Sequence, residues 1–165
     1  MLILIIITFL IDYLLSYFIP ISFNNLNYFY PMLLIVLIVY LYNKIPRKKY
    51  FNTIFILGII YDLLYSYIFL FNTLVFMLFI TIIKKIDKYL RINFLINIII
   101  IILFIFIYDL ILFCLIYLTK YNTITFNNLL YKFSHSIIIN ISYYFLLNII
   151  INKKIVNKIS KSFKK

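Results

Sequence analysis

The chain has 165 residues, of which 67% are apolar, 21% aromatic and only 12% charged, and its formal net charge is +12. A water-soluble domain of this length could not cover so much apolar area with polar surface, so the composition excludes the soluble classes of protein. It predicts an all-α integral membrane protein whose function lies within the bilayer or at its faces.

The apolar runs, taken in chain order, predict six transmembrane helices. A span needs about 20 apolar residues, and about 17 can suffice. The predicted spans are residues 2–19, 26–42, 51–67, 69–83, 94–118 and 133–151. The third and fourth have no Gly or Pro between them, but one helix over both would measure roughly 50 Å, which is too long for a single span. A hairpin is therefore predicted there.

The basic residues gather on one side of the membrane when this hairpin is present. Of the sixteen Lys and Arg residues, all except Lys120 and Lys132 then share one face. Cytoplasmic segments of membrane proteins carry an excess of Lys and Arg. We therefore expect both termini to be cytoplasmic in a multi-pass protein of the plasma membrane. The net charge follows this topology and implies no nucleic-acid partner.

Three of the four acidic residues, Asp12, Asp62 and Asp109, lie deep within the first, third and fifth predicted spans. Such a group costs roughly 2.5 to 3.5 kcal/mol on insertion scales and marks a buried, partnered or functional position. One interpretation is a proton or cation path. The other is that each carboxyl hydrogen-bonds to a neighbouring helix and fixes its rotation. We favour the second, because no Lys or Arg lies within any predicted span.

Further polar and small residues are candidates for helix packing or partner binding. The sixth span has a stripe at four-residue spacing that could partner the aspartates: Ser136, Asn140, Tyr144, Asn148 and Asn152. Gly58, the only glycine, lies one turn before Asp62 and would let a neighbouring helix approach closely. Pro31 can be accommodated in the first turn of the second helix.

The three hairpins also resemble one another. Each first helix carries an aspartate, and each outer turn carries an Asn-bearing word, at Phe23 to Leu26, Phe71 to Leu74 and Phe126 to Leu129. The alternative is chance in a chain built from few residue types. The words predict three hairpins of similar design.

The chain divides into a six-helix transmembrane domain, residues 1–152, and a basic amphipathic cytoplasmic tail, residues 153–165. The tail repeats apolar residues at four-residue spacing and carries Lys153, Lys154, Lys158, Lys161, Lys164 and Lys165. We expect these lysines to contact the inner leaflet, each contributing about 1 kcal/mol against anionic lipid. Docking of an acidic cytoplasmic partner is the alternative.

Three stretches carry a family resemblance: Pro31 to Tyr42, Gly58-Ile-Ile-Tyr-Asp62 and Phe71-Asn72-Thr-Leu74. Together they resemble the rod shape-determining protein MreD family, whose pattern includes a proline at the second helix and an asparagine, here Asn72, near the start of the fourth. Family members usually carry glycines between the aspartate and the asparagine, where this chain has Ser66 and Leu70.

The resemblance implies a non-enzymatic scaffold of the cell-elongation machinery. It implies that such a protein binds the single-span MreC protein and works with the MreB filament and the peptidoglycan synthases of the lateral wall. It also implies a fold similar to the substrate-binding subunit of energy-coupling-factor transporters.

Two rival functions come from other classes. A substrate-binding subunit of an energy-coupling-factor vitamin transporter would have a ligand pocket near the outer face and Ala motifs in its first helix, which residues 2–19 lack. A membrane enzyme acting on lipid would need a nucleophile, a metal cluster or phosphate-binding arginines near an interface. The sequence offers no catalytic constellation, metal ligand set or cofactor motif, so we expect no enzyme.

Overall fold

The structure is a computed structural model that describes residues 2–18, 31–65, 69–119 and 125–162. Within these residues the protein is all-helical, with six helices and no strand, which confirms the predicted class. The helices are α1 (Leu2–Phe18), α2 (Leu33–Tyr42), α3 (Arg47–Tyr65), α4 (Phe71–Tyr89), α5 (Phe94–Thr119) and α6 (Phe126–Ser162).

Four helix starts differ from the predicted spans. Helix α2 begins at Leu33 rather than at residue 26, α3 at Arg47 rather than at residue 51, α4 at Phe71 rather than at residue 69, and α6 at Phe126 rather than at residue 133. Pro31 does not lie in the first turn of α2, because Pro31 and Met32 are non-helical and Met32, with φ −133° and ψ 49°, is the N-cap. The sixth helix starts at Phe126 rather than at residue 133, because its first turns are polar yet still helical. Hydropathy marks where lipid contact begins, whereas backbone hydrogen bonding decides where a helix begins.

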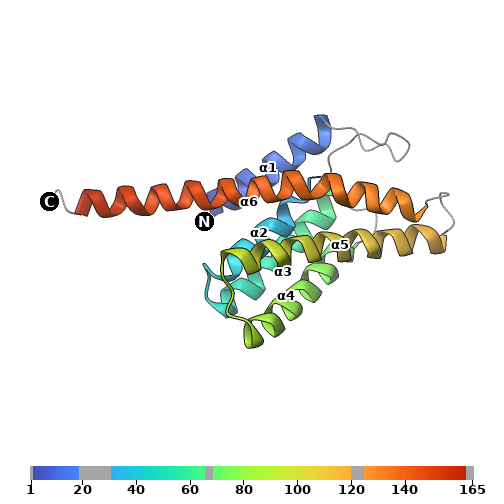
Figure 1. Cartoon of the computed structure of the whole chain (residues 1–165), viewed down its shortest axis with the longest axis horizontal. Helices are drawn as coiled ribbons and strands as arrows, with labels where there is room; N and C mark the ends of the chain where they lie inside the picture. Colours follow the sequence, from blue (N-terminus) through green and yellow to red (C-terminus); the bar gives the residue numbers. More distant parts are fainter. Residues whose placement is uncertain (1, 19–30, 66–68, 120–124, 163–165) are drawn as a thin grey trace.

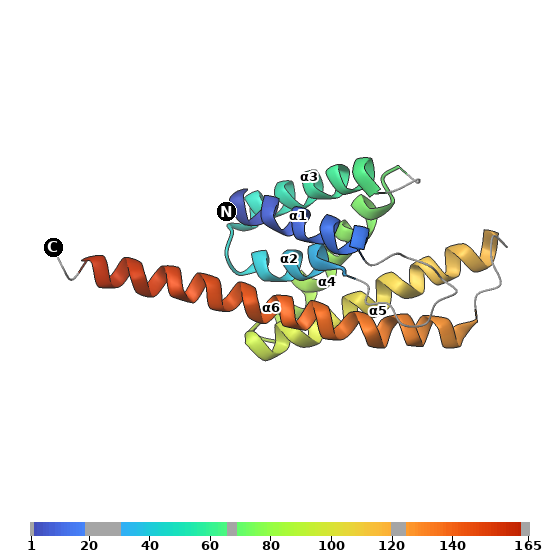
Figure 2. The ribbon, with the colours of Figure 1, turned by 90° about the horizontal axis from the view of Figure 1, so that it is seen from above.

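The predicted hairpin between the third and fourth apolar runs is present, since α3 ends at Tyr65 and α4 begins at Phe71. Helices α5 and α6 form a second hairpin and lie side by side (Figure 1). The α2–α3 and α4–α5 connections lie at the same end of the bundle as the N-terminus (Figures 1 and 2). Both connections are basic, so one end of the bundle collects the positive charge.

Helix α2 is the centre of the bundle. Every residue from Leu33 to Leu41 is buried, and α2 contacts each of the other five helices. It lies between α1 and α6 in Figure 2. At ten residues it is about 15 Å long, half the thickness of a bilayer core of about 30 Å. A helix that is apolar all round must be buried in protein or lipid, and here protein encloses it.

The outer surface is strongly apolar. Ile3, Leu63, Leu74 and Leu118 are each at least 68% exposed. Two helical segments of the described chain, Phe94–Leu118 and Phe126–Ile150, are long and apolar enough to cross a membrane by length and composition. Shorter apolar helices cover Ile3–Tyr17 and Leu33–Tyr42. An apolar surface of this extent fits contact with lipid rather than water.

Candidate functional site: three buried aspartates

Asp62 of α3 accepts four hydrogen bonds from the start of α4. Its Oδ1 accepts from Asn72 N and Asn72 Nδ2, both at 2.9 Å. Its Oδ2 accepts from Thr73 N at 2.9 Å and Thr73 Oγ1 at 2.6 Å. The N-cap of α4, Leu70, provides no side-chain cap of its own. The first N–H groups of a helix have no partner within the helix, so a carboxylate from α3 satisfies them and meets the positive end of the helix dipole.

The backbones of α3 and α4 nearly touch beside this carboxylate. A Cβ atom placed on Gly58 would lie 2.7 Å from the Cα atom of Thr73, which real Cβ atoms essentially never show. Gly58 therefore lets Thr73 come close enough to bond Asp62. Tyr108 of α5 extends the network, because its hydroxyl donates to Asn72 Oδ1 at 2.8 Å. Three helices thus meet at one polar cluster.

Asp12 of α1 occupies the corresponding place at the start of α2. Its Oδ1 accepts from Leu33 N at 3.1 Å, and Oδ1 of Asn140, from α6, accepts from Met32 N at 2.9 Å. Asn140 is held in turn by Ser136, since Asn140 Nδ2 donates to Ser136 O at 2.8 Å and to Ser136 Oγ at 2.9 Å. Two side chains from other helices therefore cap a helix that starts inside the bundle.

Asp109 of α5 forms an ion pair with Lys132 of α6, with Nζ 2.9 Å from Oδ1. The Asp109 side chain is 1% exposed and that of Lys132 is 17% exposed. Asp109 Oδ2 has no hydrogen-bond partner among the described residues. The predicted position of Lys132 outside the last helix is wrong, because α6 starts at Phe126 and includes it. Lys132 also lies within Phe126–Ile150, which is long and apolar enough to cross a membrane.

The three contacts share a design. In each hairpin an aspartate of the first helix meets a donor in the opening residues of the second: Leu33 N, the Asn72 and Thr73 groups, and Lys132 Nζ. The predicted likeness of the three hairpins is visible in these contacts. In the second hairpin the Asn-bearing word contributes directly through Asn72, whereas in the third the donor comes later, from Lys132. The word at Phe23 to Leu26 lies outside the described residues.

The aspartates find different partners from those suggested by the polar stripe of α6. Asp62 bonds to α4, and the bond of Asp12 goes to the backbone of α2, with stripe residue Asn140 capping the same helix start beside it. The stripe nevertheless pointed to a missed residue. Extended back by four residues from Ser136, it reaches Lys132, which sequence reasoning had placed in a loop. Thr73 was also missed, although it follows Asn72 in the outer-turn word.

The tail lysines from Lys153 onward lie beyond the part of the chain whose side chains the structure describes. The backbone of α6 is helical without a break to Ser162 and extends past the other helices (Figure 1). On the same side, Asp87 accepts from Tyr42 Oη at 2.8 Å and pairs with Arg47 at 3.5 Å. Among the described residues, no group of three His, Cys, Asp or Glu residues could hold a metal ion.

Chemically, the cluster around Asp62 holds helices in place. Its two oxygens accept hydrogen bonds from four donors, which occupy the lone pairs that a substrate would need. Asp109 differs, because neither of its oxygens has a hydrogen-bond partner in the described part of the chain, and Oδ1 is engaged by the ion pair with Lys132.

The family model of the rod shape-determining protein MreD matches residues 1–154 of this chain. No curated protein and no solved structure matches this chain.

Proposed function

Because the chain belongs to the MreD family of rod shape-determining proteins, we propose that it is a non-enzymatic membrane scaffold of the cell-elongation machinery. The observation that carries this proposal is the family match over residues 1–154, nearly the whole chain. The family has a part in rod shape determination. It is a family of structural proteins rather than a known enzyme family.

The residues of the resemblance support a scaffold role because they meet in space. Gly58, Asp62 and Asn72 come from two helices and form one contact between α3 and α4. Their chemistry fixes the relative position of two helices, which is what a scaffold needs to present a constant surface to partner spans.

We further propose that the chain crosses the plasma membrane six times with both termini in the cytoplasm. The basic α2–α3 and α4–α5 connections lie at one end of the bundle together with the N-terminus, which supports this topology. Non-helical backbone is tolerated at membrane depth where it is buried in protein and its polar groups are satisfied. Met32 meets this condition, since it is 9% exposed and its N–H is bonded to Asn140.

The proposed division of the chain is a transmembrane domain over residues 1–152 and a basic tail over residues 153–165. In the proposal, the tail lysines contact anionic lipid of the inner leaflet. The proposed likeness to the transporter-subunit fold rests on the family resemblance. The vitamin-transporter function gains no support from the comparisons.

The proposed partners are an MreC-like single-span protein in the membrane, the MreB filament and the peptidoglycan synthases. The test is purification of the tagged chain from its native membranes, followed by mass spectrometry of the retained proteins. We expect an MreC-like protein in the wild-type sample and at least several-fold less of it with Asp62→Leu, because loss of the α3–α4 contact alters the presented surface. Asp87→Leu, at the basic end of the bundle, is the control and should retain the partner.

Two outcomes would contradict the proposal. If Asp62→Leu retained the MreC-like protein at the wild-type level, the α3–α4 contact would not be needed for partner binding. If a pair of transport ATPases were recovered in place of elongation proteins, the chain would be assigned as a transporter subunit and not as a scaffold.

A further inference from the structure

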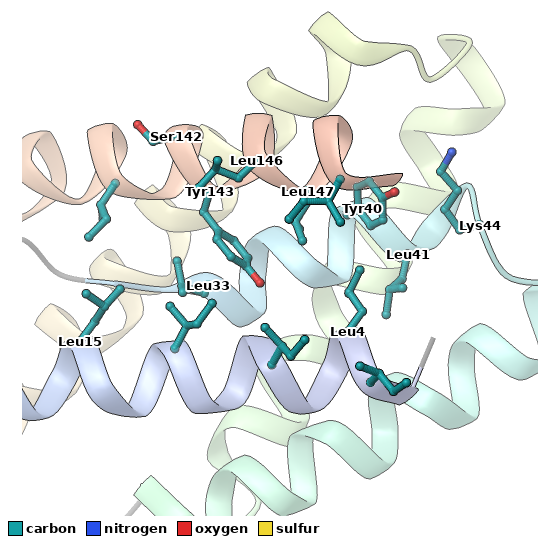
Figure 3. A pocket seen from close by; sticks show the side chains of 15 residues that line it. Leu4, Leu15, Leu33, Tyr40, Leu41, Lys44, Ser142, Tyr143, Leu146 and Leu147 are labelled. Carbon is teal, nitrogen blue, oxygen red and sulfur yellow. The ribbon is translucent and has the colours of Figure 1, made fainter. Parts of the chain in front are cut away.

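A groove of about 630 Å³ lies between α1 and α6, with α2 beneath it. Figure 3 shows side chains of these three helices lining it. Most of the lining is aliphatic, and the polar lining residues are Tyr40, Lys44, Ser142 and Tyr143. Tyr143 is already engaged, because its hydroxyl lies 2.6 Å from Thr8 Oγ1 in a hydrogen bond across the floor of the groove.

One end of the groove carries two polar donors without acceptors. The Tyr40 side chain is 4% exposed, and its hydroxyl has no hydrogen-bond partner among the described residues. Lys44 Nζ lies 5.8 Å from the centre of the Tyr40 ring. The ion pairs of the described chain use Arg47 and Lys132 and leave Lys44 without a carboxylate. Figure 3 places Tyr40 and Lys44 toward one end and Leu15 toward the other.

This polar end belongs to the basic end of the bundle. Lys44 lies in the α2–α3 connection, next to Arg47 and Lys48. Ile150, which lines the groove from α6, precedes Lys153 and Lys154 in the sequence. The apolar groove therefore ends in a positively charged region. Basic pockets between membrane helices on the cytoplasmic side typically hold anionic lipid head groups.

We propose that this groove binds one anionic phospholipid, with an acyl chain along the aliphatic lining and the phosphate at Lys44 and Tyr40. The aliphatic walls match a hydrocarbon chain, and a phosphate supplies the charged acceptor that both donors lack. A partner helix fits the site less well, because its backbone carbonyls are already hydrogen-bonded within the helix and cannot accept from Tyr40 and Lys44. The proposal is independent of the scaffold function.

The test uses the purified, delipidated full chain in detergent, with phosphatidylglycerol and phosphatidylcholine of identical acyl chains as probes. We expect native mass spectrometry to show one retained phosphatidylglycerol and its affinity to exceed that of phosphatidylcholine. Lys44→Gln should weaken phosphatidylglycerol binding roughly fivefold, the factor typical of one lysine at an anionic surface. Lys48→Gln, an equal charge change outside the groove lining, is the control and should leave the affinity within about twofold.

Two more variants separate the groove from general attraction to anionic lipid. Tyr40→Phe keeps the ring and removes the hydroxyl, so it should reduce the preference for phosphatidylglycerol without loss of folding. Ile139→Trp replaces an aliphatic side chain of the groove lining by a larger ring and should reduce binding of both lipids. Equal affinity for the two lipids, or an equal effect of Lys44→Gln and Lys48→Gln, would overturn the proposal.

The occupant is tested directly with Ile139→Cys in a Cys114→Ser background, using thiol cross-linking of the purified chain in liposomes of defined lipid composition. Protection of the introduced thiol by phosphatidylglycerol, but not by phosphatidylcholine, supports a lipid. A disulfide-linked dimer of the chain would assign the groove to a second copy and overturn the proposal. These assays contain no partner protein, so their failure and failure of the scaffold function are distinguishable.

Discussion

At the residue scale, the carboxylate of Asp62 shows how a charged group can be accommodated in an apolar bundle. Four donors from the start of α4 surround its two oxygens, and two of them are backbone N–H groups that the helix cannot satisfy itself. The same hydrogen bonds therefore replace the lost hydration of the Asp62 carboxylate and give partners to the unpaired N–H groups at the start of α4. A hydrogen bond to a charged group typically contributes about 1.5 to 3 kcal/mol.

Asp62→Asn should lower the free energy of unfolding by at least about 2 kcal/mol, because the amide would present an N–H group to donors on Asn72 or Thr73. Thermal unfolding in detergent measures this change. Asp87→Asn makes the same chemical change at the basic end of the bundle and should alter stability by less than about 1 kcal/mol. Equal effects of the two variants would show that the four bonds at Asp62 add nothing.

Gly58→Ala should be destabilising although alanine favours helices by about 1 kcal/mol over glycine. The added methyl group would meet Thr73 Cα at 2.7 Å and push α3 from α4, and overpacking of this kind costs about 1 to 3 kcal/mol. Unfolding of the variant in detergent, compared with Thr81→Ala on the exposed face of α4, tests this. A more stable Gly58→Ala protein would mean that the two helices do not pack this closely.

Leu70 is the residue of the described chain with the clearest backbone strain, since it is a non-glycine residue at φ 65°. A left-handed conformation costs an L residue about 1 to 2 kcal/mol, and glycine avoids that cost. Leu70→Gly should therefore stabilise the protein by about 0.5 to 1 kcal/mol after the greater freedom of glycine in the unfolded chain is subtracted. A higher melting temperature in detergent is the expected result.

Leu90→Gly is the matched control for this prediction. Leu90 ends the same helix in an extended conformation, φ −127°, where glycine relieves no strain. It should lower the melting temperature, because glycine only adds freedom to the unfolded chain there. A fall of similar size in both variants would show that the conformation of Leu70 carries no cost.

At the scale of the elements, each hairpin is joined by an aspartate, but the third uses an ion pair instead of backbone donors. Asp109 and Lys132 connect α5 to α6 at 2.9 Å in a largely buried position. A buried ion pair is weak evidence for stability, since losing hydration offsets much of the attraction. Removing one partner is costly for the same reason, because the other charge stays buried alone.

Lys132→Met should therefore destabilise the protein by about 3 to 5 kcal/mol, whereas Lys132→Met combined with Asp109→Leu should return to within about 1 kcal/mol of the wild type. A double-mutant cycle of unfolding free energies in detergent measures the coupling. Additive effects of the two single variants would show that the two side chains do not act as a pair.

At the scale of the whole molecule, a buried central helix is surrounded by helices with apolar outer faces, and the positive charge collects at one end. Helix α2 contacts all five other helices, so it acts as the core that a soluble protein would build from several elements. Its short length places its start inside the bundle, where Asn140 and Asp12 accept hydrogen bonds from the buried N–H groups of Met32 and Leu33.

The one-sided charge yields a test of the whole topology. Lys48→Cys and Lys88→Cys are made one at a time in a Cys114→Ser background. Each introduced cysteine should react with a membrane-impermeant thiol reagent only when the reagent has access to the cytoplasmic face. Both positions are near the two basic connections, so both should be accessible from one side. Labelling of the two cysteines from opposite sides would rule out six crossings.

The sequence by itself determined the helical class, the α3–α4 break and the three aspartates as the positions to explain. These follow from hydropathy, length and charge, which are properties of local stretches of chain. Residues 31–83 also carried the family resemblance. The sequence did not determine that Lys132 lies within α6 or that Pro31 precedes α2, because polar residues next to an apolar run can be loop or helix with equal hydropathy.

Only the tertiary structure decided which donors meet the carboxylates and which helix is enclosed by the others. Asp62 bonds to Thr73 because Gly58 permits a close contact between the backbones of α3 and α4. Asp109 meets Lys132 because α5 and α6 lie side by side with these two residues at the same level along the helices. Such pairings depend on the rotation and axial position of each helix against its neighbours. A single helix has no preference for either, so packing of the whole bundle is what fixes them.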